Sequence, residues 1–420
     1  MDNRTAARKI IEAALAAVDP YRSVFRSLTA IQAQRIFVVG AGKASARMAE
    51  AAEAALGDRI VAGWVNTKYG HGAELRRIHC HECGHPVPDE AGVFGAQQIA
   101  NLARSAGEGD LVVVLLSGGG SALMPLPAAG VSLAVKQETT RRLLDSGANI
   151  HEMNAVRKHL SAIKGGRLAQ LAAPAEVLCL ILSDVIGDDV GTIGSGPTAP
   201  DPSTLADAHA ILRRYNIPDP IPEGSETPKP GDPVLNKVCN LVVSNNRAAL
   251  QAAAHKARNL GFHTLLLATT ISGETREVAS MHAAILREVC VSGNPAVRPA
   301  CILSGGETTV TIRGAGKGGR NQEFALAAAL EIADLDNVLV ASFGTDGTDG
   351  PTDAAGAYAD GSTTVRAANA GYEATRNLDN NDAYPLFEAI GDLLITGPTR
   401  TNVMDIYLLL AGPATEERKP

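Results

Sequence analysis

The sequence contains few aromatic residues and few cysteines. Aromatic side chains account for 4% of the 420 residues, whereas 42 residues are glycine. This composition is typical of an alanine- and glycine-rich α/β protein. Six cysteines in a chain of this length exclude a disulfide framework. We interpret Cys179 and Cys301, which lie within apolar stretches, as small buried hydrophobic residues.

The sequence also lacks a long apolar run and an excess of positive charge. No apolar run reaches the roughly 18 residues that a membrane span needs. The first residues, MDNRTAARKIIEAALAAV, carry charges through their apolar stretch, which predicts an amphipathic helix instead of a signal peptide and a cytoplasmic location. A net charge of −7 argues against nucleic acid or an anionic membrane as partner. A small anion can still bind where basic side chains and backbone N–H groups converge.

The length and the order of apolar segments predict the architecture. A chain of 420 residues is too long for one compact core, so two domains are expected. Six prolines between residues 218 and 233 mark an extended connection and a candidate boundary. Unbroken apolar strands that run into glycine-containing turns predict a parallel sheet built from βαβ units, with the site at the carboxyl ends of the strands. These segments lie at residues 36–56, 111–127, 176–204 and 301–333.

The first glycine turn is of the nucleotide-binding type. Gly40 and Gly42 are candidate phosphate-binding residues, with Lys43 at the tip of the turn. The dinucleotide fingerprint is incomplete, because Ser45 takes the place of the third glycine and the next strand ends in Asn-Thr-Lys without an acidic residue. The spacing also differs from a Walker A loop. The alternative is a lysine that merely begins a helix.

A second turn offers backbone N–H groups and two hydroxyls with no bulky side chain in the way, which favours a phosphate nest. Its residues are Ser117, Gly118, Gly119, Gly120 and Ser121. The alternative is a flexible turn without a ligand.

The third glycine-rich region joins a buried strand to an alanine-rich helix. Gly305 and Gly306 end the strand, and Arg320 precedes the helix that begins near Asn321. Free N–H groups at a helix start, the helix dipole and a guanidinium together make an anion site. The alternative is two glycine turns and a surface arginine.

Carboxylates after the apolar strands are candidates for Mg²⁺ or for substrate binding. They are Asp184, Asp189, Glu307 and Asp346. Mg²⁺ prefers one or two carboxylates together with phosphate oxygens and water, and Asp189 and Asp346 are the candidates for it. Ordinary Asp-Gly turns are the alternative.

Two further clusters have two interpretations each. Arg157, Lys164 and Arg167 share one face if their helix continues through two glycines, which gives either a solvated face or a basic wall near the site. The segment His79–Cys83 lacks the second ligand pair of a structural zinc site. We therefore favour a turn set by the following prolines, with His85 available to a ligand.

Eight motifs in the same order resemble the class II glycerate 2-kinase family, whose C-terminal part is called the MOFRL domain. The similarity spans roughly residues 4–412, although the His79–Cys83 insert is not part of the family pattern. The motifs are GAGKAS, GHPVPDEAG, LLSGGGSALMPLP, NAVRKHLSAIKGGRLA, LSDVIGDDVGTIGSGPT, SGGETTVTIRGAGKGGRNQE, FGTDGTDGPTDAAGA and TGPTRTNVMD. The resemblance implies a Rossmann-like domain with a parallel sheet at 1–235 and a MOFRL α/β domain with a mixed sheet at 236–412. It also implies an active site in the cleft between them.

The resemblance further implies ATP-dependent phosphorylation of D-glycerate at its 2-hydroxyl, with ATP and Mg²⁺ as cofactors. The family's catalytic residues carry over to Lys43, Arg320 and Asn402. Lys43 and Arg320 are the cations expected at the transferred phosphoryl group, and replacing either by alanine is expected to abolish turnover with little effect on stability. A homodimer is a possible assembly.

Three alternatives stay open. One is an NAD(P)H-dependent hydroxypyruvate reductase, a name that members of this family have also carried, which would need a dinucleotide pocket. Another is a kinase of a related sugar acid such as erythronate. The third is a sensor that binds a sugar acid without consuming ATP.

Overall fold

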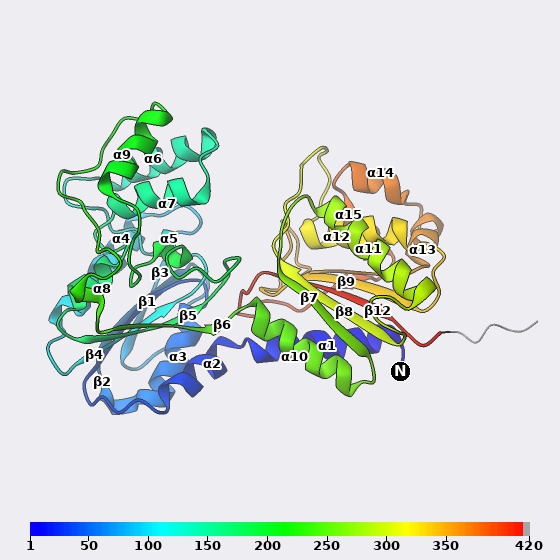
Figure 1. Cartoon of the computed structure of the whole chain (residues 1–420), viewed down its shortest axis with the longest axis horizontal. Helices are drawn as coiled ribbons and strands as arrows, with labels where there is room; N and C mark the ends of the chain where they lie inside the picture. Colours follow the sequence, from blue (N-terminus) through cyan, green and yellow to red (C-terminus); the bar gives the residue numbers. More distant parts are fainter. Residues whose placement is uncertain (415–420) are drawn as a thin grey trace, which may run out of the picture. The chain divides into compact units, whose positions relative to one another are not determined.

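The computed structural model describes residues 1–414 and shows two compact units (Figure 1). The N-terminal unit comprises Pro20–Ser244. The C-terminal unit comprises Met1–Asp19 together with residues 245–414. None of the helices in residues 1–414 has the length and apolar character that a membrane crossing requires.

The N-terminal unit is built on a six-stranded sheet in the order β3-β2-β1-β4-β5-β6, in which all neighbours are parallel. The central strands β1 and β4 are buried along their whole length, as their unbroken apolar sequences predict. The strands are β1 (Ile36–Ala41), β2 (Ile60–Lys68), β3 (Ile78–Cys83), β4 (Leu111–Leu116), β5 (Glu176–Leu182) and β6 (Val238–Ser244). The expected parallel, Rossmann-like sheet is confirmed.

Helices cover both faces of this sheet (Figure 1). The helices α2 (Pro20–Leu28) and α3 (Ser45–Leu56) cover one face, and α4 (Glu90–Ser105) and α8 (Arg167–Ala172) share a core with the other. A separate apolar cluster holds together α6 (Leu133–Asp145), α7 (Ile150–His159) and α9 (Leu205–Arg214). The short helices are α5 (Gly120–Leu123), η1 (Gly57–Arg59), η2 (Ile193–Ser195) and η3 (Pro233–Leu235).

The C-terminal unit contains a mixed sheet in the order β11-β10-β9-β12-β8-β7. Only β7 and β8 are parallel neighbours, and the other pairs are antiparallel. The strands are β7 (His263–Ile271), β8 (Ala300–Gly306), β9 (Val338–Gly344), β10 (Gly356–Ala359), β11 (Leu393–Leu394) and β12 (Asp405–Ala411). The last strand therefore inserts between β8 and β9, and the expected mixed sheet is confirmed.

The helices of this unit again form two layers (Figure 1). One face of the sheet carries α1 (Asn3–Ala17) and α10 (Asn246–Asn259). The other carries α11 (Thr275–Ser292) and α12 (Arg320–Glu331), whose apolar residues form one core with the sheet. The shorter helices α13 (Thr363–Asn369), α14 (Ala374–Asp379) and α15 (Ala383–Ala389) extend this second layer.

The compact units are divided differently from the expected domains 1–235 and 236–412. The first helix, α1, buries its alanine and isoleucine face in the C-terminal unit and packs against α10. The strand β6 follows the proline-rich segment 218–233 but hydrogen-bonds to β5. The proline-rich segment therefore lies within the N-terminal unit, because strand pairing, which composition does not show, assigns β6 to the first sheet.

Packing of α4 on β2 generates a prediction about stability. A methyl group on Gly95 would lie 2.1 Å from Oδ1 of buried Asn66, whose Nδ2 donates to the Leu123 carbonyl at 2.7 Å. Gly95→Ala should therefore lower the free energy of unfolding by about 1–3 kcal/mol. Gly107→Ala is the matched control, because the nearest atom to its added methyl lies 3.9 Å away. Urea unfolding measures both, and equal stabilities would contradict this packing argument.

Candidate active site

The loops that follow β1 and β4 are hydrogen-bonded to each other. The backbone N–H of Lys43 donates to the Gly118 carbonyl at 2.9 Å, and that of Ser117 donates to the Ala41 carbonyl at 3.2 Å. The Ser117 hydroxyl accepts the N–H of Ala44 at 3.1 Å. These loops leave neighbouring strands at the point where the strand order reverses. In open α/β sheets this is where ligands bind.

Two of the predicted glycines permit this close approach. Gly42 has φ +149°, and a methyl group on it would lie 2.0 Å from the Ser117 hydroxyl oxygen. A methyl group on Gly118 would lie 2.0 Å from a carboxylate oxygen of Asp184. Since no side chain fits at either position, the absence of Cβ atoms lets Asp184, which follows β5, lie against the turn.

Lys43 and His85 also lie at this turn. A methyl group on Gly119 would lie 2.8 Å from His85 Nε2 and 3.4 Å from Lys43 Cγ. Burial, together with the charge of Lys43, lowers the pKa of His85 to about 4, so this imidazole is neutral at physiological pH. Within residues 1–414 the Lys43 ammonium makes no hydrogen bond or ion pair. The turn therefore presents a cation that is available to a ligand.

The structure gives three other predicted glycines a packing role. A methyl group on Gly40, Gly305 or Gly306 would lie 2.3, 2.1 or 2.0 Å from the nearest atom of a neighbouring residue. These positions exclude side chains because a neighbouring strand or the start of α10 packs against them, which sequence alone does not distinguish from phosphate binding.

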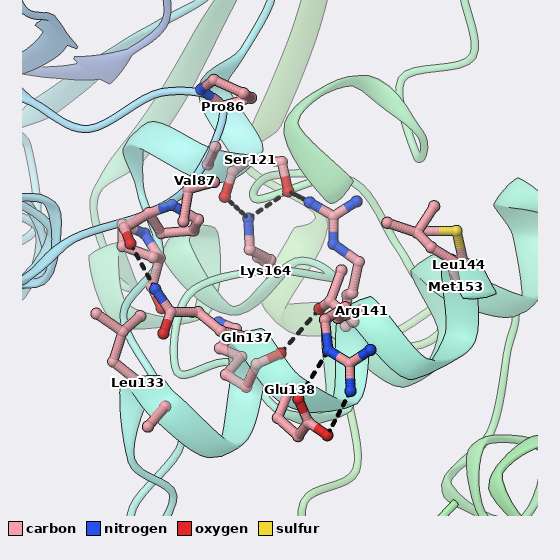
Figure 2. Close-up of a pocket in the computed structure, with 17 residues that line it drawn as sticks. Pro86, Val87, Ser121, Leu133, Gln137, Glu138, Arg141, Leu144, Met153 and Lys164 are labelled. Carbon is pink, nitrogen blue, oxygen red and sulfur yellow. Dashed lines mark hydrogen bonds and ion pairs between the residues drawn. The ribbon is translucent and has the colours of Figure 1, made fainter.

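The predicted basic stripe does not form a solvated face. The side chain of Lys164 is 1% exposed, and it donates to the carbonyl and hydroxyl oxygens of Ser121 at 2.7 and 2.8 Å (Figure 2). Arg157 donates to the same hydroxyl. Arg167 instead binds backbone carbonyl oxygens, that of Lys158 at 3.1 Å among them. The helix α7 ends at His159, before two glycines with positive φ, so the condition for one shared face, a helix that continues through these glycines, is not met.

In the C-terminal unit, Arg320 is held by two carboxylates. Its Nε and Nη2 lie 2.6 and 3.1 Å from the two carboxylate oxygens of Asp405. Its Nη1 lies 2.6 Å from Glu307. The Asp405 side chain is 0% exposed and that of Glu307 is 43% exposed. Arg320 is therefore fixed on a buried carboxylate and paired with a half-exposed one on its outer side.

The pKa values within this cluster follow from burial and pairing. Burial raises the pKa of Asp405 to about 7, although its bonds to Arg320 and Asn321 act in the opposite direction. Burial acts against the charged guanidinium of Arg320, but Asp405 and Glu307 outweigh it and raise the pKa further above its ordinary value. The arginine therefore stays charged at every physiological pH. Sequence reasoning did not single out Asp405, although it is the last residue of the motif TGPTRTNVMD.

The expected free N–H groups at the start of α12 are occupied. The Asp349 carboxylate accepts the backbone N–H groups of Asn321 and Gln322 at 3.0 and 2.8 Å. Gly319 makes room for it, since a methyl group there would lie 2.3 Å from the Asp349 carboxyl carbon. The prediction of an anion site at this helix start therefore needs correction, because the anion is a side chain of the chain itself.

The remaining carboxylate and amide candidates differ in their surroundings. Asp346 accepts the N–H and the hydroxyl of Thr348 through Oδ1, at 3.0 and 3.1 Å. It lies near Asp405, because a methyl group on Gly344 would meet Oδ1 of Asp346 at 3.3 Å and of Asp405 at 3.5 Å. Asn402 lies in the loop before β12, where its Oδ1 accepts the N–H of Met404.

Asp189 is used within its own loop. One of its carboxylate oxygens accepts the N–H of Gly191 at 3.2 Å, and the other accepts the Thr192 hydroxyl. In residues 1–414, no group of three or more His, Cys, Asp or Glu side chains is placed to hold a metal ion by itself. The rings of His79 and His81 pack on Trp64, with centroids 4.0 and 5.5 Å apart.

The fold and these side chains define an α/β protein of two units with a nucleotide-type glycine turn at the switch point of its parallel sheet. Residues 6–226 match a domain of unknown function, DUF4147, and residues 300–405 match the MOFRL family. The chain belongs to the MOFRL-domain glycerate 2-kinase family, as its motifs predict.

Relatives are similar over nearly their whole length. A glycerate 2-kinase from Pyrococcus horikoshii is 40% identical over 98% of each chain. A putative hydroxypyruvate reductase from Agrobacterium vitis is 45% identical over 97% of this chain and 94% of the relative. The crystal structure of a glycerate kinase from Thermotoga maritima superposes with a TM-score of 0.93 at 42% identity, covering 97% of this chain and 99% of that one.

The buried ion pair generates a second stability prediction. Asp405→Ala leaves the guanidinium of Arg320 without its buried partner, so it should lower the free energy of unfolding by about 3 kcal/mol or more. Glu12→Ala is the control, because its pair with Arg8 spans 4.0 Å and both side chains are 67% exposed. That change should cost less than about 1 kcal/mol. An Asp405→Ala protein as stable as the control variant in urea unfolding would refute a buried pair.

Proposed function

We propose that this protein is a glycerate 2-kinase, which transfers the γ-phosphoryl group of ATP to the 2-hydroxyl of D-glycerate and releases ADP and 2-phosphoglycerate. Relatives named glycerate 2-kinase and D-glycerate 2-kinase, 40% and 43% identical, support the activity. The structural observation that carries it is the Lys43 ammonium, which has no ion-pair partner within residues 1–414, on a glycine turn at the switch point of a parallel sheet. A cytoplasmic location and a homodimer are further proposals.

Phosphoryl transfer needs alignment and cations where charge spreads over the transferred group. We assign Lys43 to the transferred phosphoryl group, with the backbone of the Ser117–Ser121 turn holding the phosphate chain. Arg320 is already oriented by Asp405. Its outer partner, the half-exposed Glu307, contributes only about 0–1 kcal/mol, as surface ion pairs do. An incoming phosphate can therefore replace Glu307 on the guanidinium.

The donor set around Asp346 fits Mg²⁺ better than that around Asp189. Asp346 Oδ1 accepts two bonds from Thr348, and within residues 1–414 Oδ2 makes no hydrogen bond or ion pair. Both oxygens of Asp189 are engaged in its own loop. One carboxylate suffices, since Mg²⁺ takes its other ligands from phosphate oxygens and water. When bound, the ion neutralises charge on the ATP phosphates.

The name of the Agrobacterium vitis relative makes hydroxypyruvate reduction the competing activity. The glycine turn speaks against it. The Ser45 hydroxyl, at the third position of the fingerprint, donates to backbone carbonyls of Gly42 and Asn66 at 2.8 and 2.6 Å. Mixing the protein with NADH and hydroxypyruvate tests the alternative, and NADH consumption would favour the reductase.

Direct assay of the kinase reaction tests the proposal. Wild-type protein with Mg-ATP and D-glycerate should form ADP and 2-phosphoglycerate, distinguished from 3-phosphoglycerate by chromatography. Lys43→Ala should abolish turnover, whereas Lys9→Ala, an exposed lysine on α1, should not. No ADP above background with wild-type protein would reject the function. A panel of hydroxy acids, erythronate included, identifies the preferred acceptor.

Because Arg320 is paired with buried Asp405, Arg320→Lys is a better test of its role in turnover than Arg320→Ala. Arg320→Ala would leave buried Asp405 without its partner, so the expectation of little effect on stability does not hold for this variant. Arg320→Lys keeps the charge and loses the two-pronged geometry, so it should lower turnover by roughly a thousandfold with a smaller change in melting temperature. Turnover close to wild type in Arg320→Lys would show that this guanidinium does not contact the transferred group.

Paired carboxylate variants test the Mg²⁺ assignment. In Asp346→Asn the Mg²⁺ concentration for half-maximal activity should rise roughly tenfold or more, because a charged ligand becomes neutral. In Asp189→Asn it should stay within about twofold, since that carboxylate serves its own loop. Titrating MgCl₂ at fixed ATP measures both concentrations. A larger rise in Asp189→Asn than in Asp346→Asn would assign the Mg²⁺ site to Asp189 instead.

A further inference from the structure

Two buried lysines and one partly buried arginine line one cavity of the N-terminal unit. The cavity measures about 610 Å³ and lies between the Pro86–Pro88 turn, the start of α5 and the helices α6 and α7 (Figure 2). These three cations are Lys136, Lys164 and Arg157, and a fourth basic residue of the lining, Arg141, is paired with Glu138. Lys136 donates to the Pro125 carbonyl at 2.8 Å, and the other two converge on the Ser121 hydroxyl. Within residues 1–414 none of the three forms an ion pair.

Neutral oxygens are weak compensation for cations taken out of water. Burial, and then the charge of Arg157, lowers the pKa of Lys136 to about 7. Burial and the neighbouring cations lower the pKa of Lys164 well below its ordinary value. Of the other charged groups nearby, Glu138 and Arg141 line the cavity and pair with each other at 2.8 Å. Arg167 also opposes the charge on Lys136. Residues 1–414 therefore supply no carboxylate partner to Lys136, Arg157 or Lys164.

Apolar side chains surround these cations. Met153 is buried, but Val87 and Leu144 are 67% and 59% exposed at the edges of the cavity (Figure 2). A three-carbon acid is too small to cover them. The volume falls within the range of pockets that enclose larger organic ligands. The cavity thus combines a cationic floor with apolar walls.

We propose that this cavity is the nucleotide subsite of the kinase, in which a nucleoside polyphosphate places phosphate oxygens on Lys164, Arg157 and Ser121 and its base against the apolar walls. This inference rests on the proposed function. Ser121 ends the glycine turn that we assign to the phosphate chain, so the two features form one continuous surface. A polyphosphate carries enough negative charge to balance three cations, whereas the carboxylate of a hydroxy acid carries one.

Nucleotide binding should be accompanied by proton uptake. At about pH 8 the free cavity holds Lys136 mostly in its neutral form, because its pKa is about 7. Bound phosphate favours the charged form and raises the pKa of both lysines, so protons move from the buffer to the protein. A carboxylate bound elsewhere in the protein would not produce this uptake.

Calorimetric titration of the full chain with ADP at about pH 8, in two buffers of different ionisation enthalpy, measures the uptake. The apparent binding enthalpy should depend on the buffer with the sign of proton uptake. Lys164→Met should weaken ADP binding roughly tenfold or more and reduce the uptake. Leu144→Asp, at an exposed position that tolerates a polar residue, should also weaken ADP binding. Val291→Asp, 79% exposed on α11 in the other unit, is the matched control and should bind ADP like wild type.

The outcomes separate this inference from the proposed function. If wild-type protein phosphorylates glycerate but Lys164→Met and Leu144→Asp leave the affinity for ADP unchanged, the cavity is not the nucleotide subsite and the kinase assignment stands. If the same variants weaken binding of D-glycerate and not of ADP, the cavity binds the acceptor and the inference is overturned. If wild-type protein lacks kinase activity, the function itself fails.

Discussion

The hydrogen bonds that join the loops after β1 and β4 are the constraint on which the N-terminal site depends. A parallel sheet brings these two loops to the same edge, but contact between their backbones requires positions without a Cβ atom. Gly42 and Gly118 supply them. Once the loops are joined, Lys43 and Asp184 approach the same turn from different strands. The site is therefore a property of backbone packing first and of its polar side chains second.

The two units differ in whether carboxylates of the chain compensate their buried or partly buried cations. In the C-terminal unit, carboxylates compensate both the guanidinium of Arg320 and the start of α12. A cation fixed on a buried partner is already oriented before a ligand arrives, which is the preorganisation that electrostatic catalysis requires. In the N-terminal unit, Lys43 and Lys164 have no carboxylate partner within residues 1–414. The N-terminal unit can therefore accept the negative charge of a ligand, whereas the C-terminal unit holds the charge of Arg320 in a fixed position.

Local patterns in the sequence predicted the fold well and the site only in part. Apolar runs and glycine turns are short-range signals, and they located β1, β4 and β8 together with the parallel sheet, whereas the mixed sheet was expected only from the family resemblance. The buried partner of Arg320 was not predictable, because Asp405 lies 85 residues away and reaches it only through the strand order of the mixed sheet. The burial of Lys164 could not be predicted from the sequence for a different reason. Helical periodicity relates Lys164 to Arg157 and Arg167 only if the helix continues, but α7 ends at His159 and two glycines with positive φ follow.

Buried lysines suit a ligand site better than exposed ones would, and the reason lies in their titration. A lysine that is permanently charged in an apolar cavity would destabilise the free protein, whereas one whose pKa has fallen to about 7, as for Lys136, can lose its proton at little cost. The charge then appears when an anion enters, so part of the electrostatic attraction exists only in the complex. The free cavity avoids the mutual repulsion of three cations, and the occupied cavity replaces it by attraction to the ligand. Uncompensated cations around a cavity are therefore consistent with a stable fold, provided that their protonation is coupled to binding.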